Sequence, residues 1–128
     1  MDLILDKINI LPLLKAQKKF NLFIQHLSSE QEKAGAVQAF EYCYELSWKT
    51  LKKILEVKGV ETASPRDAFR EAAKNHLIDD PEIWFGFLKI RNLTTHTYNE
   101  EFSEEVVNSF PEFKLQLDKM VLNIQALK

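Results

Sequence analysis

The fold is decided by residues 28–59, which read SSEQEKAGAVQAFEYCYELSWKTLKKILEVKG. Apolar side chains recur in this stretch at spacings of three and four residues, which is the period of one face of an α-helix. Ser28 and Ser29 before acidic residues are typical of a helix start, and Gly59 suits the left-handed position that follows a helix end. The stretch predicts one long helix, ending at Lys58, whose apolar face carries Val37, Phe40, Tyr44, Trp48, Leu51 and Leu55.

On the N-terminal side, residues 2–27 also carry a helical stripe. It consists of Ala16, Phe20, Phe23 and Leu27. Pro12 lies inside this segment, and proline removes a backbone donor and clashes with the preceding turn of a helix. Because proline is accepted in the first turn, we expect a helix that either starts or kinks at Pro12.

On the C-terminal side, two pairs of residues predict helix starts. Ser64 before Pro65 predicts a short helix over residues 65–76, and Asp80 before Pro81 predicts a second helix. In both cases a capping side chain precedes a proline at the first helical position.

The last third of the chain is divided by Pro111. Residues 99–102 predict a polar turn, and Ser103 predicts a cap for a short helical piece that ends near Phe110. A final helix is expected from Pro111 to about Leu127. Its inward face is predicted to carry Phe113, Leu117, Met120, Val121 and Ile124.

Composition supports a single helical domain, residues 1–128. The chain has 128 residues, of which 45% are hydrophobic, and only three glycines and four prolines interrupt it. This is long enough to bury one core and rich in helix-forming residues. We expect an all-α fold, an antiparallel up-and-down four-helix bundle with an extra short helix.

Charge and residue content exclude several classes of partner and ligand. A net charge of −2 argues against a general nucleic-acid coat, so any nucleic-acid site must be local. The single cysteine, Cys43, can form no intrachain disulfide and is expected to be a buried, inert thiol, which fits a reducing cytoplasm.

The charged N-terminal run is too short to span a bilayer, so no membrane association is expected. Dispersed histidines predict no metal site, and no cofactor is expected.

Glu41 and Glu45 stand four residues apart on the long helix and would repel each other on one face. Two interpretations remain open. The pair forms a solvated acidic edge, or it binds an arginine from another helix. Glu45 and Lys49 form a favourable pair in the correct order along the helix.

Residues 91–98, RNLTTHTY, concentrate the polar chemistry of the chain. Arg91 can neutralise charge that develops on phosphate oxygens, and His96 can transfer a proton at neutral pH. Asn92 and Thr95 can orient a substrate. This set suits cleavage of an RNA phosphodiester without a metal; the alternative is a hydrogen-bonded Arg91, His96 and Tyr98 network that stabilises a dimer interface.

The spacing in this stretch raises a geometric question. On a straight helix, at about 100° per residue, Arg91 and His96 diverge by roughly 140°, whereas Arg91 and Tyr98 are nearly eclipsed. Arg91 and His96 would then not hold one phosphate together. Either the helix ends around Thr95 and His96 turns back, or a second copy supplies half of the site across a two-fold axis.

Arg91, His96 and Tyr98 match the Arg-x4-His-x-Tyr motif of the HEPN superfamily. The chain resembles the branch of that superfamily called HepT or nucleotidyltransferase substrate-binding protein, over about residues 34–112. Further motifs of the branch stand in the same order. They are AFE at 39–41, YELSWKTLK at 44–52, KG at 58–59, SPR at 64–66 and IRN at 90–92.

The resemblance implies a helical bundle that forms a homodimer and is encoded beside a minimal nucleotidyltransferase of the type called MntA. It implies a toxin of a toxin–antitoxin pair that cleaves RNA without a metal, with Arg91 and His96 as the catalytic pair. The partner nucleotidyltransferase would be the antitoxin and would adenylylate Tyr98. The same resemblance implies an alternative, a non-catalytic subunit that binds substrate for the nucleotidyltransferase.

Overall fold

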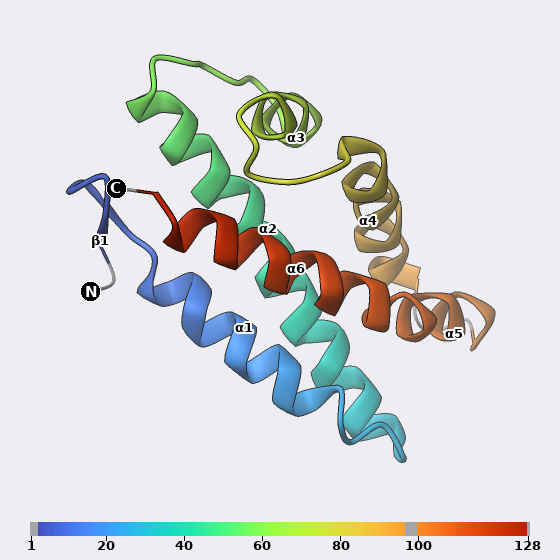
Figure 1. Ribbon diagram of the computed structural model, residues 1–128. Helices are drawn as coiled ribbons and strands as arrows, with labels where there is room; N and C mark the ends of the chain where they lie inside the picture. The colour runs from blue at the N-terminus through green and yellow to red at the C-terminus, as the bar shows by residue number, and fades with distance from the viewer. Residues whose placement is uncertain (1–2, 97–99, 128) are drawn as a thin grey trace.

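The computed structural model describes residues 3–96 and 100–127, and its chain opens with a small hairpin (Figure 1). Strand β1 (Leu3–Ile4) pairs antiparallel with β2 (Ile8–Asn9), and Leu5 and Asp6 turn between them with positive φ angles. Ile4 and Ile8 are direct partners and both are buried. The first part of the segment 2–27, in which a helical stripe was predicted, therefore forms strands.

Helix α1 (Leu11–Phe23) settles the question left open at Pro12. Pro12 lies in the first turn of α1, so the helix starts there and does not kink. The backbone N–H of Leu11 donates to the side chain of Asn9 at 3.0 Å. Because α1 begins only at Leu11, the residues before it lie outside the helix and pair as strands.

Helix α2 (Glu30–Val57) confirms the long helix that the sequence predicts. Ser29 and Glu32 form a reciprocal capping box: the Ser29 hydroxyl accepts from the Glu32 N–H, and the Glu32 carboxylate accepts from the Ser29 N–H, both at 3.0 Å. At the other end Gly59 has φ of 85°, and Gly59 and Val60 donate back to Glu56 and Leu55. This left-handed ending is the one predicted for Gly59.

Helix α3 (Pro65–Lys74) begins at the predicted Ser64–Pro65 cap but ends two residues earlier than expected. His76 lies beyond the helix, with φ of 63°, and its N–H donates to the Ala73 carbonyl. A histidine here occupies the left-handed position that glycine usually takes. The prediction of a helix to His76 was therefore wrong, because helical periodicity does not reveal a non-glycine residue with positive φ.

Helix α4 (Pro81–Leu93) begins at the predicted Asp80 cap, whose carboxylate accepts from the Glu82 N–H at 2.9 Å. It tightens after Leu93 into a single 3-10 turn, η1 (Thr94–His96). The α-helix therefore ends at Leu93. One of the two alternatives for bringing Arg91 and His96 together requires the helix to end around Thr95, close to this point.

Helices α5 (Glu100–Asn108) and α6 (Phe110–Gln125) complete the chain. Ser103 was expected to cap a helix, but it lies inside α5, whose first turn is formed by Glu100 and Glu101. Pro111 lies in the first turn of α6, so that helix starts at Phe110, one residue earlier than predicted. The predicted inward face of α6 is confirmed in full. Phe113, Leu117, Met120, Val121 and Ile124 are all buried.

The helices form the expected all-α up-and-down bundle (Figure 1). Helix α1 runs opposite to α2 and packs against both α2 and α6. The short helix α3 lies beside the C-terminal half of α2, and α4 follows it at the edge of the bundle. Within the part of the chain that has been described, no helix combines the length and apolar character needed to cross a membrane.

Aromatic rings form the centre of the core, and Phe113 of α6 lies among them. Its ring is fully buried. Ring centroids lie 4.8 Å away for Phe40, 5.0 Å for Phe87, 5.2 Å for Phe20 and 5.9 Å for Trp84, all in edge-to-face arrangements. One side chain of α6 therefore joins α1, α2 and α4.

Replacing this ring tests the packing. We expect Phe113→Ala to lower the free energy of unfolding by about 3–5 kcal/mol, because it opens a cavity among four aromatic rings. Leu122→Ala is the matched control on the same helix: Leu122 is 67% exposed, so its loss should change stability by less than about 0.5 kcal/mol. Urea unfolding followed by circular dichroism measures both; equal losses for the two variants would contradict this account of the core.

Candidate functional site

The candidate site lies where the end of α4 meets the middle of α2. Arg91, in the last turn of α4, approaches Glu41 and Glu45, which are one turn apart on α2. Its Nη1 lies 3.1 Å from Glu41 Oε2, and its Nε lies 3.8 Å from Glu45 Oε1. Of the two interpretations of the glutamate pair, the arginine from another helix is therefore confirmed.

Thr94 closes this cluster from the first residue of η1. Its hydroxyl accepts a hydrogen bond from Arg91 Nη1 at 3.1 Å and lies 3.1 Å from Glu41 Oε2 and 2.7 Å from the Arg91 carbonyl oxygen. The side chain is buried, unlike those of its neighbours Thr95 and His96. Thr94 thus contacts both members of the Arg91–Glu41 ion pair.

Glu45 has other partners besides Arg91. Its Oε2 accepts from the indole N–H of Trp48 at 3.1 Å and lies 3.8 Å from Lys49 Nζ, which confirms the predicted Glu45–Lys49 pair. Arg91 Nε is buried and makes no hydrogen bond to any residue that the structure describes. Glu41, whose carboxylate lies at the shorter distance, is therefore the principal carboxylate partner of Arg91.

The electrostatics of the cluster follow from these contacts. One guanidinium lies between two carboxylates, and Lys49 supplies a second positive charge to Glu45. Arg91 is about one quarter exposed, so one side of it is accessible from solvent. An incoming phosphate would compete with Glu41 for the same guanidinium, because both are anions that bind its N–H groups.

His96 is exposed at the last position of η1. Its ring centroid lies 6.2 Å from that of Phe102 on α5, with the two planes tilted by 60°. Within one copy of the chain, Arg91 thus contacts α2, whereas His96 contacts α5. The end of the α-helix at Leu93 agrees with the alternative in which the helix ends and His96 turns back. However, these contacts direct the Arg91 and His96 side chains toward different helices.

The remaining predicted site residues are near this junction. Asn92 and Thr95 are exposed, and the Thr95 hydroxyl donates to the Asn92 backbone carbonyl at 3.0 Å. Tyr98 lies outside the described residues. Sequence reasoning singled out Thr95 and missed Thr94 and Phe102. One signal for Thr94 was available in the sequence. It follows Arg91 by three residues, and side chains three residues apart on a helix are neighbours on its surface.

Other groups do not add to the site. Burial raises the pKa of the Cys43 thiol to about 12, which leaves it protonated at neutral pH and confirms an inert, buried cysteine. Over residues 3–96 and 100–127, no three His, Cys, Asp or Glu side chains gather closely enough to hold a metal ion.

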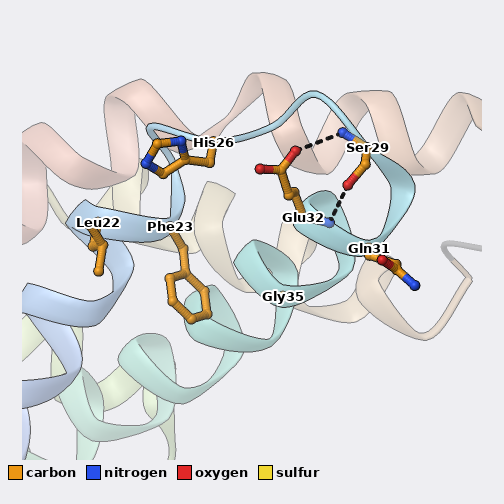
Figure 2. Close-up of a pocket in the computed structure, with 7 residues that line it drawn as sticks. All are labelled: Leu22, Phe23, His26, Ser29, Gln31, Glu32 and Gly35. Atoms are coloured by element: carbon orange, nitrogen blue, oxygen red, sulfur yellow. Dashed lines mark hydrogen bonds between the residues drawn. The ribbon is translucent and has the colours of Figure 1, made fainter.

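Several hollows lie along the N-terminal half of α2, and two of them bear on the site. One, of about 550 Å³, adjoins the candidate site and extends from Thr94, Glu41 and Ser103 toward Glu30. Another, of about 470 Å³, lies between the end of α1 and the start of α2 (Figure 2). In Figure 2 the polar groups of Ser29 and Glu32 bond to each other's backbone, so they cap α2 in this second hollow. The hollow beside Thr94 is therefore the one connected to the predicted chemistry.

Comparison with known proteins identifies the family. A family model described as nucleotidyltransferase substrate binding protein like matches residues 9–126. The chain belongs to this family. The resemblance inferred from the Arg91–Tyr98 motif and the motifs around it is thereby confirmed for the family.

One relative of this chain carries a name that states an activity. The chain is 35% identical over 88 residues to a Haemophilus influenzae protein named "Probable ribonuclease HepT". The match spans 65% of this chain and 60% of that relative, so it covers less than two thirds of the relative's length.

Solved structures share the fold. A Thermus thermophilus protein superimposes with a TM-score of 0.82 and 30% identity, covering 88% of this chain and 98% of the other. A Haemophilus influenzae protein, described as having the fold of a substrate binding domain of a nucleotidyltransferase, gives 0.78 and 28%, covering 88% and 96%. Both cover nearly all of the compared chains, which supports the all-α family fold.

The unequal roles of the two glutamates can be measured. A double-mutant cycle of Arg91→Ala with Glu41→Ala should give a coupling of about 1 kcal/mol in the free energy of unfolding, because the pair is half-buried and its charged atoms lie 3.1 Å apart. The matched cycle with Glu45→Ala should give less than about 0.5 kcal/mol, since that contact is longer and Glu45 is also bonded to Trp48. A coupling to Glu45 equal to or larger than that to Glu41 would contradict this assignment.

Proposed function

We propose that this protein is a HepT-like endoribonuclease, the toxin of a toxin–antitoxin pair, which cleaves RNA without a metal. Arg91 and His96 are its catalytic residues, and Asn92 and Thr95 support the substrate. The observation that carries the proposal is the junction of α4 and η1. It presents an exposed imidazole five residues after a guanidinium that is fixed by Glu41 and Thr94. Similarity to a protein named for ribonuclease activity supports the same reaction.

The chemistry needs only these two side chains. The imidazole of His96 takes the proton of a ribose 2′-hydroxyl, whose oxygen then attacks the adjacent phosphorus. The bond from phosphorus to the 5′-oxygen breaks, and that oxygen leaves with a proton from a protonated imidazole. Arg91 binds the non-bridging phosphate oxygens and stabilises the charge that grows on them in the transition state.

The proposed site is composite and lies between two copies of the chain. Within one copy Arg91 contacts α2, whereas His96 contacts Phe102 of α5 and solvent. A two-fold axis beside η1 would place Arg91 of one copy opposite His96 of the other, because an isologous contact repeats every residue across the axis. The same axis supplies two imidazoles, one as base and one as acid.

The proposed partner is a nucleotidyltransferase of the MntA type, which acts as the antitoxin in the cytoplasm, where RNA and ATP are both available. It would transfer an adenylyl group to Tyr98: the phenol oxygen attacks the α-phosphorus of ATP, and pyrophosphate leaves. The added phosphodiester is an anion close in sequence to Arg91. It would compete with the substrate phosphate for the guanidinium.

Cleavage of a single-stranded RNA tests the reaction. Arg91→Ala and His96→Ala should each lower the cleavage rate at least about 100-fold, because each removes a group that acts in the transition state. The exposed residues Arg70 and His26, on α3 and after α1, give the matched controls Arg70→Ala and His26→Ala, which should cleave at the wild-type rate. Excess EDTA should leave the rate unchanged. Full activity of either Arg91→Ala or His96→Ala would exclude this assignment.

Modification of Tyr98 is tested separately by mass spectrometry. After incubation with the partner nucleotidyltransferase and ATP, the wild-type chain should gain one adenylyl group and lose RNA cleavage. Tyr98→Phe should gain none and remain active in the presence of the partner. Tyr42→Phe, which alters an exposed tyrosine on α2, should be labelled as the wild type is. Equal labelling of Tyr98→Phe would remove Tyr98 from this role.

A second function is favoured by a different observation. Glu41 already neutralises Arg91 in the free chain, which suits an arginine that joins two helices. In that case the protein is a non-catalytic subunit that binds substrate for a nucleotidyltransferase, as the family description suggests. Purified protein that binds the nucleotidyltransferase but leaves RNA intact at all pH values and salt concentrations tested would select this function over the first.

A further inference from the structure

We infer that Thr94 is a positioning residue, which fixes the Arg91 guanidinium against Glu41 and couples it to the turn that carries His96. This inference rests on the proposed ribonuclease function and deepens it. Thr94 is not one of the named residues of the Arg-x4-His-x-Tyr motif, and its contacts with Arg91 and Glu41 are seen only in the structure.

The contacts of Thr94 carry the inference. Its hydroxyl lies 3.1 Å from Arg91 Nη1, 3.1 Å from Glu41 Oε2 and 2.7 Å from the Arg91 carbonyl oxygen. Arg91 Nη1 itself lies 3.1 Å from Glu41 Oε2. Guanidinium, carboxylate and hydroxyl thus form a closed triangle, in which each group contacts the other two.

The donors and acceptors in this triangle are complementary. Arg91 Nη1 carries two hydrogens and lies at ion-pair distance from Glu41 Oε2. The Thr94 hydroxyl accepts one of them through a lone pair and has a single proton to donate, which both Glu41 Oε2 and the Arg91 carbonyl are placed to receive. Because the cluster is partly buried, losing the hydroxyl would leave a guanidinium N–H without that acceptor.

The location of Thr94 explains why its effect reaches beyond Arg91. Thr94 is the first residue of η1, and His96 is the last. Its bond to the Arg91 carbonyl closes the end of α4, where the backbone changes from α-helical to 3-10 geometry. The same side chain therefore fixes the direction of the guanidinium and the start of the turn on which the imidazole stands.

The next residue in the chain provides a natural control. Thr95 has the same side chain and lies in the same turn, but it is exposed, and its hydroxyl donates to the Asn92 carbonyl at 3.0 Å. It contacts neither Arg91 nor Glu41 through any hydrogen bond that the structure describes. Removing its hydroxyl changes the local chemistry of the turn without touching the triangle.

The first test is steady-state cleavage of a single-stranded RNA by the full-length protein. Thr94→Val keeps the shape of the side chain and removes the hydroxyl, and it should lower kcat roughly tenfold while KM stays within about twofold. Thr94→Ser, which restores the hydroxyl, should recover most of kcat. Thr62→Val, which removes a buried hydroxyl that makes no hydrogen bond to the described residues and lies outside the proposed site, should match the wild type. Thermal melts accompany each variant, so a loss of kcat with an unchanged melting temperature separates positioning from a loss of folding.

The second test follows the guanidinium itself and needs no RNA. In NMR spectra of the 15N-labelled protein, assigned with Arg91→Lys, the Nη1 hydrogens of Arg91 should exchange slowly because Nη1 donates a hydrogen bond to Thr94. Their signals should broaden or vanish in Thr94→Val and persist in Thr94→Ser and Thr95→Val.

The outcomes separate this inference from the proposed function. Wild-type kcat in Thr94→Val, or unchanged Arg91 signals in that variant, would overturn the positioning role. If the wild-type protein cleaves no RNA, the proposed function fails. The NMR comparison then decides alone whether Thr94 holds Arg91: loss of the signals in Thr94→Val supports the hold, and their retention overturns it.

Discussion

The apolar face of α2 must be covered along its whole length, and the rest of the structure follows from that constraint. At 28 residues and about 1.5 Å per residue, α2 is about 42 Å long, whereas the 13 residues of α1 reach only about 20 Å. The hairpin β1–β2 lies beside the last turns of α2, where Lys7, Ile8 and Asn9 line a surface with Lys53, Glu56 and Val57. Helix α3 packs against α2 as well, and α6 brings Phe113 against Phe40.

The polar edge of α2 imposes a second constraint. Glu41 and Glu45 repel each other, and the bundle brings Arg91 between them from the end of α4. The pairing stabilises the packing of α4 on α2, and it also holds one guanidinium in a defined place. In the proposed ribonuclease function these two effects would oppose each other. A guanidinium held by a carboxylate is well positioned but partly neutralised, so a phosphate must offer better geometry or more charge than Glu41.

Much of the fold was predictable because its signals are local. The long helix, its serine N-cap and its glycine ending were all predicted from short-range patterns, as were the caps at Ser64 and Asp80 and the inward face of α6. The errors occur where local signals mislead. A hairpin of two-residue strands carries too few residues to show alternation. Ser103 resembles a cap, although acidic residues three positions earlier start the helix, and His76 takes a left-handed conformation that its residue type does not suggest.

For the candidate site, the sequence by itself determined which chemical groups are present: an arginine and a histidine five residues apart, and two glutamates one helical turn apart. It determined the family as well, through motifs in a fixed order. Only the tertiary structure decided that Arg91 faces Glu41 across 50 residues of chain, and that Thr94, not Thr95, joins that pair. The physical reason is that helical periodicity gives the angle of a side chain about its own axis. The neighbour that the side chain meets depends on how two helices cross, which is set by packing between distant segments.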